Sequence, residues 1–359
     1  MDLNKIVLED LDYITNNTKE LDLNGSKILI TGCAGFLGYY FTNYLALSMK
    51  DLGIKKIIAL DSFLLGHPIW LDKLRNHIGE SLEVISFTLG KDNIKQINNY
   101  LDITHIIHMA SIASPTFYRQ FPLETVDANV WGLRDLFDSY LESKKLKGFL
   151  FFSSSEIYGD PDHENIPTKE DYRGFVSCTG PRACYDESKR FGETLCSIYR
   201  QKYNMPITIV RPFNNYGPGM KPTDKRLPAD LANCILENKD IIIYSNGRPT
   251  RTFCYVADAI CGFLKALFSG KKGEYNIGID NNETSVYELA DIFRNAGKKF
   301  LKYNGQIIFK ESLDKNYLND NPQRRCPNID KARKELLFNP KIPVVNGVEK
   351  YLNFLLLSK

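Results

Sequence analysis

Six short runs of apolar, β-branched and aromatic residues alternate with segments of helix length along the first 210 residues. The runs cover 27–31, 56–61, 84–87, 104–110, 148–153 and 206–210. Several are continuously apolar, which is typical of strands covered by helices on both faces. Three segments between them are long enough for crossover helices, at 36–50, 123–143 and 184–203. This alternation predicts an α/β fold built on a doubly wound parallel sheet.

The pattern changes after residue 211, where prolines and glycines cluster in RPFNNYGPGMKPTDKRLP. Two shorter elements follow, a helix near 229–237 and a strand at 241–244, and further helices are expected near 286–296 and 347–357. We expect residues 212–359 to form a smaller substrate-binding domain over the carboxyl ends of the strands, where open α/β sheets bind ligands. Residues 27–211 would form the larger domain, with chain crossovers between the two, and residues 1–26 an arm or capping helix.

Composition narrows the class of protein. The chain has 359 residues, 25% of them charged, and a net charge of +3, which is too balanced for a surface that binds nucleic acid. No uninterrupted apolar segment reaches the 18 residues of a membrane span. The 8 cysteines include no CxxC pair, and His105 and His108 would face opposite sides of a strand, so we expect no metal. The acidic N-terminal segment has no signal-peptide pattern, and we expect a cytoplasmic protein.

A glycine-rich turn follows the first expected strand in TGCAGFLG, residues 31–38. Gly32, Gly35 and Gly38 permit a tight turn, close approach to a pyrophosphate and close helix packing, and the next helix presents its N-terminus to the phosphates. Asp61 ends the second expected strand, where a carboxylate binds the ribose hydroxyls and repels a 2′-phosphate. The pattern predicts an NAD-binding Rossmann domain.

A second constellation indicates chemistry at a sugar hydroxyl. Tyr185 and Lys189 are spaced to share one helix face. A phenol has a pKa near 10, and we expect Lys189 and a nicotinamide cation to lower it, so that Tyr185 acts as a base. The hydroxyl of Ser154, after another strand, would hydrogen-bond the reacting oxygen. Tyr140 and Lys144 repeat the spacing without such neighbours, and we expect no catalysis there.

Together these motifs resemble a known family. TGCAGFLG, HMASIASP, SSSEIYGDP, YDESK and RPFNNYGPG resemble the extended short-chain dehydrogenase/reductase superfamily, in its nucleotide-sugar branch, from about residue 26 to 355. PRACYDESKR, SNGRPTRTFCYV and NPQRRCPNI are most similar to UDP-glucuronate decarboxylases, also called UDP-xylose synthases. The resemblance implies NAD as cofactor, a UDP-sugar as substrate, and a homodimer formed by helices 123–143 and 184–203 as a four-helix bundle.

The resemblance also implies further site residues. Beside the glycines and Asp61, the cofactor would contact Phe36, Leu37, Ala110 and Ser111. The substrate would contact Arg182, Asn214, Arg226, Tyr244 and Arg251. Ser155, Glu156 and Arg325 would serve the sugar carboxylate and C5. The sequence departs from the family pattern at Gly219, where an arginine is usual, and at Tyr39, where a small residue is usual.

Several reactions share this machinery. Oxidation at C4 of UDP-glucuronate makes a ketone β to the C6 carboxylate, and such an acid loses carbon dioxide readily to give UDP-xylose or a 4-keto pentose. A 4-epimerase, a 4-dehydrogenase or a 4,6-dehydratase for another nucleotide sugar is the alternative, although dehydratases carry an Asp-Glu pair where this chain has Ser155 and Glu156. A non-catalytic protein that senses NAD is a remote alternative, since such proteins usually lack the Tyr, Lys or Ser.

Overall fold

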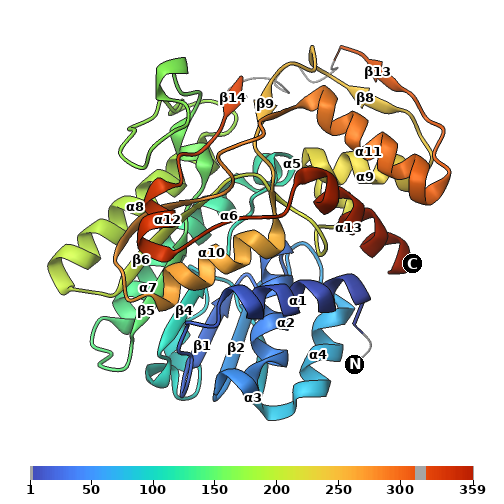
Figure 1. Cartoon of the computed structure of the whole chain (residues 1–359). Helices are drawn as coiled ribbons and strands as arrows, with labels where there is room; N and C mark the ends of the chain where they lie inside the picture. The colour runs from blue at the N-terminus through green and yellow to red at the C-terminus, as the bar shows by residue number, and fades with distance from the viewer. Residues whose placement is uncertain (1–2, 312–320, 359) are drawn as a thin grey trace.

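A parallel sheet of seven strands forms the centre of the protein (Figure 1). The computed structural model describes residues 3–311 and 321–358, so residues 1–2 of the expected arm 1–26 and residues 312–320 and 359 of the region 212–359 lie outside the described residues. The strand order is β11-β6-β5-β4-β1-β2-β3, and all neighbours are parallel. The strands are β1 (Lys27–Thr31), β2 (Lys56–Asp61), β3 (Leu82–Ser86), β4 (His105–His108), β5 (Gly148–Phe152), β6 (Ile207–Pro212) and β11 (Gly273–Ile277).

Helices cover both faces of this sheet, and the predicted doubly wound architecture is confirmed. Within β1, Ile28 and Ile30 face a cluster that includes α2 (Phe36–Leu47) and α10 (Val256–Phe268). Leu29 faces the opposite cluster, to which α7 (Gly132–Tyr140) and α8 (Ala183–Tyr203) contribute. Successive strand residues are therefore buried on alternate sides, which explains why the strand sequences read as continuously apolar.

Some expected elements are shorter or divided. The segment 36–50 contains α2 and a short α3 (Met49–Leu52), and 123–143 contains α6 (Pro122–Val126), a π-helical turn (Asp127–Trp131) and α7. The expected strand 104–110 pairs only over β4, because the chain leaves the sheet at residue 109 to line the ligand edge. Among the elements that were not predicted, β11 and α10 return to the central sheet after the Pro- and Gly-rich segment.

Most of the remaining C-terminal elements lie beyond the carboxyl ends of the central strands (Figure 1), whereas the helix at Asp330–Leu336 packs against β11 and α10. Three small sheets contain the pairs β10-β7 and β13-β8 and the order β12-β9-β14. The helices are α9 (Leu227–Leu236), α11 (Val286–Leu301), α12 (Asp330–Leu336) and α13 (Val344–Leu357). The short strands are β7 (Asn215–Tyr216), β8 (Ile241–Ile243), β9 (Thr250–Arg251), β10 (Cys254–Tyr255), β12 (Thr284–Ser285), β13 (Ile307–Phe309) and β14 (Arg324–Arg325). Two further helices, α4 (Ile69–Ile78) and α5 (Pro115–Gln120), belong to the first half of the chain.

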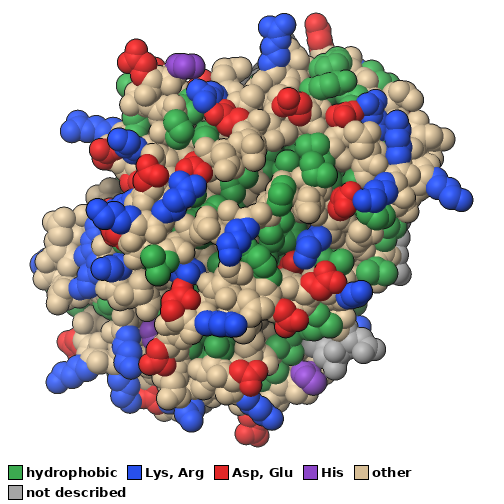
Figure 2. All heavy atoms as spheres, in the orientation of Figure 1, with side chains coloured by type: hydrophobic (Ala, Val, Ile, Leu, Met, Phe, Trp, Pro, Cys, Tyr) green, Lys and Arg blue, Asp and Glu red, His purple; other side chains and the backbone are tan. Residues whose placement is uncertain are grey.

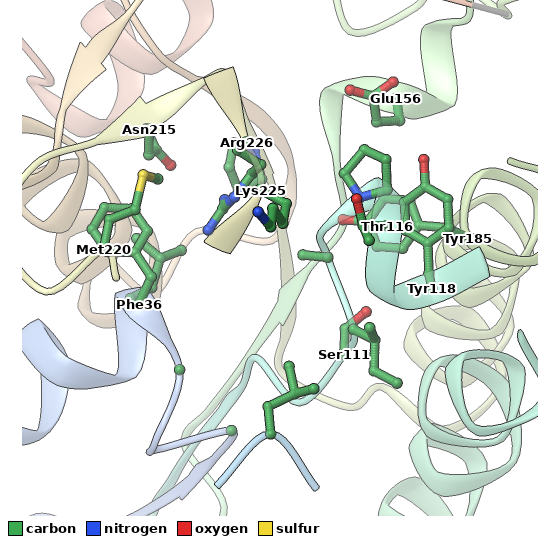
Figure 3. A pocket seen from close by; sticks show the side chains of 18 of the residues that line it. Phe36, Ser111, Thr116, Tyr118, Glu156, Tyr185, Asn215, Met220, Lys225 and Arg226 are labelled. Carbon is green, nitrogen blue, oxygen red and sulfur yellow. The ribbon is translucent and has the colours of Figure 1, made fainter. Parts of the chain in front are cut away.

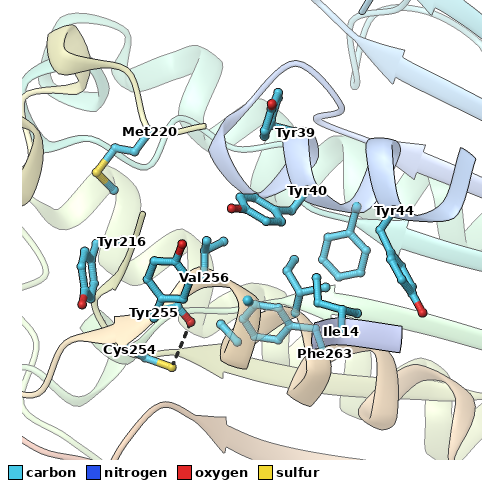
Figure 4. Packing of buried hydrophobic residues seen from close by; sticks show 14 of the residues in the cluster. Ile14, Tyr39, Tyr40, Tyr44, Tyr216, Met220, Cys254, Tyr255, Val256 and Phe263 are labelled. Carbon is cyan, nitrogen blue, oxygen red and sulfur yellow. Dashed lines mark hydrogen bonds between the residues drawn. The ribbon is translucent and has the colours of Figure 1, made fainter. Parts of the chain in front are cut away.

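The N-terminal helix α1 (Lys5–Asn17) is an integral part of the core. It packs against α10 and α13, and its buried Asp10 accepts hydrogen bonds from the hydroxyls of Tyr40 (2.7 Å) and Tyr255 (2.6 Å). Lys350 donates to the same carboxylate at 2.8 Å. Figure 4 shows Tyr40 and Tyr255 close together in this packing, with Ile14 of α1 nearby. Burial raises the pKa of Asp10, against the lowering effect of Lys350.

The surface shows mixed charge. On the face in Figure 2, Lys and Arg side chains are interspersed with Asp and Glu, without a large area of one sign. Among the described residues, no helix has both the length and the apolar character needed to span a membrane.

Candidate active site

A cavity of about 990 Å³ opens at the carboxyl ends of the central strands, between the sheet and the C-terminal elements. Every site residue expected from the sequence lines it except Ser154, which hydrogen-bonds the lining residue Tyr185. The lining residues among them are Gly32, Gly35, Phe36, Leu37, Gly38, Asp61, Ala110, Ser111, Ser155, Glu156, Arg182, Tyr185, Lys189, Asn214, Arg226, Tyr244, Arg251 and Arg325. Figure 3 shows Glu156, Tyr118 and Tyr185 on one side of the cavity, and Phe36, Met220 and Arg226 on the other.

The glycine-rich turn has the geometry of a phosphate-binding loop. Gly32 has a φ of +78°, and a Cβ there would lie 2.8 Å from the backbone nitrogen of Ala110. A Cβ on Gly38 would lie 2.3 Å from the carbonyl oxygen of Gly32, so only glycine lets α2 pack this closely on the turn. Gly35 is the N-cap of α2 and lines the cavity, and a Cβ there would lie 3.4 Å from the carbonyl oxygen of Gly32, an ordinary contact distance. A ligand's phosphates can therefore approach this backbone and the helix N-terminus.

Polar groups beside the turn fit a dinucleotide. Asp61 accepts hydrogen bonds from the backbone N–H groups of Ala34 and Phe63, both at 2.9 Å, and each carboxylate oxygen keeps a second lone pair for a ribose hydroxyl. Burial raises the pKa of Asp61, and these two N–H groups act against it. The hydroxyls of Ser111 and Ser153 line the cavity and have no hydrogen-bond partner among the described residues. The cavity edge therefore fits NAD.

Tyr185 and Lys189 lie one turn apart on α8, with the Lys189 ammonium 5.8 Å from the centre of the Tyr185 ring. The ammonium donates to the carbonyl of Phe152 at 2.7 Å. Burial lowers the pKa of Lys189 to about 7. Burial also raises the pKa of Tyr185 to about 12, although a hydrogen bond with Ser154 acts against it. The lowered pKa expected for Tyr185 is thus not present in the chain by itself, because burial disfavours the charged forms of both groups.

Tyr118 of α5 was not identified from the sequence. Its ring stacks on that of Tyr185, with centroids 5.1 Å apart and an interplanar angle of 11°. It lines the cavity, and its buried hydroxyl has no hydrogen-bond partner among the described residues. The only sequence signal was its position shortly after HMASIASP, in a segment that follows a strand end.

A cluster of arginines and carboxylates lies on the same side as Tyr185. Glu156 accepts hydrogen bonds from both Arg182 and Arg325, which lie far apart in the sequence. Burial alone would raise the pKa of Glu156, but these two guanidinium groups outweigh it and lower the pKa to about 2. Arg325 exposes only 4% of its side chain. Glu156 is therefore ionised at neutral pH and fixed between two cations.

Arg251 extends the cluster toward the C-terminal elements. It donates to the carbonyl of Pro322 at 2.5 Å and to Asn321 Oδ1 at 3.1 Å. Both acceptors are neutral, so these hydrogen bonds do not neutralise the positive charge of Arg251. Burial and the nearby Arg325 lower the pKa of Arg251 to about 9. A guanidinium in this setting favours an anionic ligand.

The remaining expected contacts lie across the cavity. Arg226 lies 5.5 Å above the Phe36 ring and pairs with Asp224, and Asn214 donates to the carbonyl of Thr252 at 3.0 Å. Tyr244 is partly exposed at the cavity edge. In Figure 3, Arg226 lies on the side of the cavity opposite Glu156.

Neither histidine of β4 joins a cluster. His108 hydrogen-bonds Thr31 Oγ1 at 2.8 Å and stacks on Phe151, and burial lowers its pKa to about 3. His105 pairs with Thr104 Oγ1 at 2.9 Å. Within residues 3–311 and 321–358, no group of three or more His, Cys, Asp or Glu residues is arranged to hold a metal ion.

The glycine turn, Asp61 and the Tyr185–Lys189 pair define an NAD-dependent enzyme of the short-chain dehydrogenase/reductase type. Comparison with known families agrees. The NAD dependent epimerase/dehydratase family matches residues 28–278, more than half of the chain, and the protein belongs to that family.

Individual relatives and structures were also found. The chain is 31% identical over 334 residues to UDP-glucuronic acid decarboxylase 1 of Xenopus tropicalis, covering 91% of this chain and 72% of that protein. It is 32% identical over 322 residues to UDP-glucuronic acid decarboxylase 6 of Arabidopsis thaliana, covering 90% and 86%. The crystal structure of UDP-glucuronic acid 4-epimerase from Bacillus cereus, in complex with UDP-glucuronic acid and NAD, has a TM-score of 0.77 at 25% identity and covers 93% of this chain and all of that one. A Bacillus anthracis dTDP-glucose 4,6-dehydratase in complex with NAD, 21% identical, has the same TM-score and covers 93% and 98%, which shows the shared fold.

Proposed function

We propose that the protein decarboxylates UDP-glucuronate to UDP-xylose or to the UDP-4-keto-pentose. One observation carries the proposal: an arginine-rich cluster around Glu156 lies beside Tyr185 in the cavity. A sugar whose C4 hydroxyl lies at Tyr185 places its C6 substituent one carbon beyond C5, within reach of this cluster. Guanidinium groups recognise carboxylates through charge-assisted hydrogen bonds, so the geometry favours an acidic sugar over a neutral one. The curated relatives named as decarboxylases support the same substrate.

The first step is oxidation at C4. Tyr185 takes the proton of the C4 hydroxyl, and Ser154, which hydrogen-bonds Tyr185, holds that oxygen in place. NAD, which the glycine turn and Asp61 would hold, would supply the acceptor for the hydride of C4 and, where the product is UDP-xylose, the donor that returns it, with Tyr185 giving its proton back to O4. Tyr185 accepts the proton of the C4 hydroxyl as a phenolate. The ammonium of Lys189 stabilises that negative charge, because its hydrogen bond to the carbonyl of Phe152 holds it nearby. The product is a 4-ketone β to the C6 carboxylate.

The second step is loss of carbon dioxide. The C5–C6 bond breaks, its electron pair forms an enolate on C5, C4 and O4, and Tyr185 with Ser154 donates hydrogen bonds to O4. Arg325 and Ser155 orient the carboxylate so that this bond lies perpendicular to the carbonyl plane. Glu156 has too low a pKa to donate a proton itself, and we assign it to hold a water molecule that gives a proton to C5, with the resulting hydroxide taking a proton from solvent.

The rest of the cavity would bind the nucleotide. We assign the diphosphate to Arg226 and Arg251 and place Asn214 and Tyr244 toward the ribose and base. In this arrangement residues 27–211 hold NAD and residues 212–359 supply most of the UDP contacts.

Labelled substrate tests the reaction directly. Purified protein with NAD is incubated with UDP-glucuronate labelled with carbon-13 at C6, released carbon dioxide is trapped, and the sugar is followed by NMR. Labelled carbon dioxide and a pentose product are expected. A product that retains C6 with inverted C4 would instead identify a 4-epimerase, the activity in the name of the Bacillus cereus neighbour. Conversion of neutral sugars only would indicate a dehydratase or dehydrogenase, and bound NAD without any turnover a sensor.

We also propose a homodimer formed by helices α6 to α8. Large apolar side chains are exposed there: Leu123 (74%), Trp131 (53%), Phe191 (49%) and Ile198 (47%). A patch of this kind marks an interface, and helices of two copies packing as a four-helix bundle would bury it. Analytical ultracentrifugation is expected to give twice the chain mass, and Phe191→Glu to give the monomer.

A further inference from the structure

Arg182 is shared between two carboxylates. Its Nη2 donates to Glu156, and its Nε donates to Asp186 Oδ2 at 3.3 Å. Asp186 follows Tyr185 in the first turn of α8, and its side chain is 7% exposed. It does not line the cavity, so it reaches a bound sugar only through Arg182.

Asp186 is incompletely satisfied. Its Oδ1 is buried and accepts no hydrogen bond within residues 3–311 and 321–358. A buried carboxylate usually accepts several hydrogen bonds, and one that lacks them is costly to ionise. The ionisable groups that act on it come from four parts of the fold. They are Arg182 and Tyr185 on and before α8, Glu156 after β5, Tyr118 of α5 and Arg325 of β14.

We propose that Asp186 is a positioning residue that sets how strongly Arg182 attracts the acidic group of a sugar in the cavity. As a carboxylate, Asp186 neutralises Arg182 from behind and adds a negative charge to the cluster. As a carboxylic acid, it leaves the full charge of Arg182 to Glu156 and to the bound anion. This deepens and rests on the proposed function, since it assumes an acidic sugar.

The switch falls near neutral pH. Burial and the charge of Glu156 raise the pKa of Asp186 to about 7, against the lowering effects of Arg182 and Arg325. The acidic sugar is therefore expected to bind more tightly below this pH than above it. A neutral sugar on the same nucleotide lacks the group that Arg182 attracts, and its affinity should not follow Asp186.

Binding measurements isolate this effect from turnover. A Tyr185→Phe protein loaded with NAD is titrated calorimetrically with UDP-glucuronate and with UDP-glucose, at about pH 6 and about pH 8.5. The preference for UDP-glucuronate should shrink on the order of 3- to 10-fold at the higher pH, as one added charge near the ligand implies. Adding Asp186→Asn, which mimics the protonated acid, should keep the preference at both pH values. Adding Glu187→Gln, an exposed neighbour on α8, should leave the pH effect unchanged.

Steady-state kinetics give an independent reading in the unmodified enzyme. KM for UDP-glucuronate should rise between these pH values while Asp186→Asn holds KM flat, and the pH dependence of kcat, to which Lys189 contributes, should remain in both. Ordinary misfolding of the variant would not remove a pH step from KM alone.

The outcomes separate the two proposals. If UDP-glucuronate is preferred but the preference does not change with pH, or changes equally in Asp186→Asn, the role of Asp186 is refuted and the proposed function stands. If UDP-glucuronate is preferred at neither pH, the proposed function itself fails, and the role of Asp186 fails with it.

Discussion

The ring of Tyr39 occupies the space in which a side chain at Gly219 would begin. A Cβ on Gly219 would lie 2.6 Å from Tyr39 Cδ1, and the φ of Gly219 is +86°. Tyr39 also packs edge-on against Trp70, with centroids 4.9 Å apart. Both are positions at which the sequence departs from the pattern of the resembling family. Because these two residues touch, the large ring of Tyr39 fits here only because position 219 is a glycine, which has no side chain.

Restoring the usual arginine at position 219 is therefore expected to destabilise the protein. Gly219→Arg should lower the free energy of unfolding by about 2–4 kcal/mol, from the left-handed backbone and from overpacking against Tyr39. In a Tyr39→Ala background the overpacking disappears, so the double-mutant cycle should show a coupling of about 1–3 kcal/mol. Denaturant unfolding measures all four proteins.

A second glycine provides the control. Gly270 has a φ of +69° with nothing within 4 Å of its Cβ position, so Gly270→Arg carries the backbone cost without the contact. It should cost about 1–2 kcal/mol and show no coupling to Tyr39. Equal costs at the two glycines, or additivity in the cycle, would mean that Tyr39 and Gly219 are independent.

The sequence predicted the central strands well because their burial on both faces leaves a continuous apolar run. β11 was missed because its sequence, GEYNI, carries Glu274 and Asn276. Both have partners that a sequence does not show: Glu274 pairs with Arg200, and the buried Asn276 bonds the carbonyl of Thr168. A local sequence pattern indicates which apolar residues are buried. It does not show that a buried polar side chain has a hydrogen-bond partner far away in the sequence.

The same limit applies to the cavity. Sequence motifs predicted the glycine turn and the pair of Tyr185 and Lys189, because each of these is formed by residues that lie close together in the sequence. Tyr118 and Asp186 escaped because their significance comes from contacts with Tyr185 and with the shared guanidinium of Arg182. The raised pKa of Tyr185 in the chain without a cofactor was also not anticipated, because charge proximity was considered without the effect of burial.

Removal of the Tyr185 hydroxyl is expected to abolish most activity while preserving the fold. Tyr185→Phe deletes the proposed base and should lower kcat about 10²- to 10⁴-fold. Bound NAD, measured after denaturation, should be retained, because the ring remains stacked on Tyr118. The matched control is Tyr140→Phe in the second YxxxK, whose hydroxyl is buried without a partner in the described part of the chain. Normal activity is expected there, and a comparable loss would remove the distinction between the two motifs.

Glu156 should stabilise the folded protein as well as serve the reaction. Its carboxylate pairs with two guanidinium groups, so Glu156→Gln is expected to lower the free energy of unfolding by about 2 kcal/mol at neutral pH. The pKa of about 2 in the folded protein lies below the ordinary glutamate pKa of 4.5. The contribution is therefore complete above about pH 5 and is lost as pH falls through about 2.

Thermal unfolding of both proteins across this range tests the assignment. The gap in Tm should narrow steadily as the pH is lowered from about 5 toward 2. Exposed Glu142 supplies the comparison, and Glu142→Gln should leave Tm nearly unchanged throughout. A gap that stays constant with pH would show that Glu156 does not act through its charge.

Lys189 is expected to lower the stability of the folded protein while it supports catalysis. Its ammonium is buried with 2% of the residue exposed, and burial lowers its pKa to about 7 from 10.5. Lys189→Met keeps the apolar length and removes this cost, although it leaves the carbonyl of Phe152 without its donor. We expect the cofactor-free variant to gain about 1–2 kcal/mol of stability and to lose catalysis.

The sign of the pH dependence distinguishes this mechanism from improved packing. Below about pH 7 the lysine is charged in both folded and unfolded chains, so the folded protein bears the full cost of burying the charge. Between about pH 7 and 10.5 the folded chain holds the neutral amine while the unfolded chain still binds the proton. The free energy of unfolding of the wild-type protein therefore rises with pH in this window. The stability advantage of Lys189→Met, measured by urea unfolding without NAD, should therefore be largest near pH 6 to 7 and shrink toward pH 10. If the stability advantage of Lys189→Met does not depend on pH, the gain comes from packing. If Lys189→Met is less stable than the wild-type protein at about pH 7, the hydrogen bond to Phe152 contributes more than the buried charge costs.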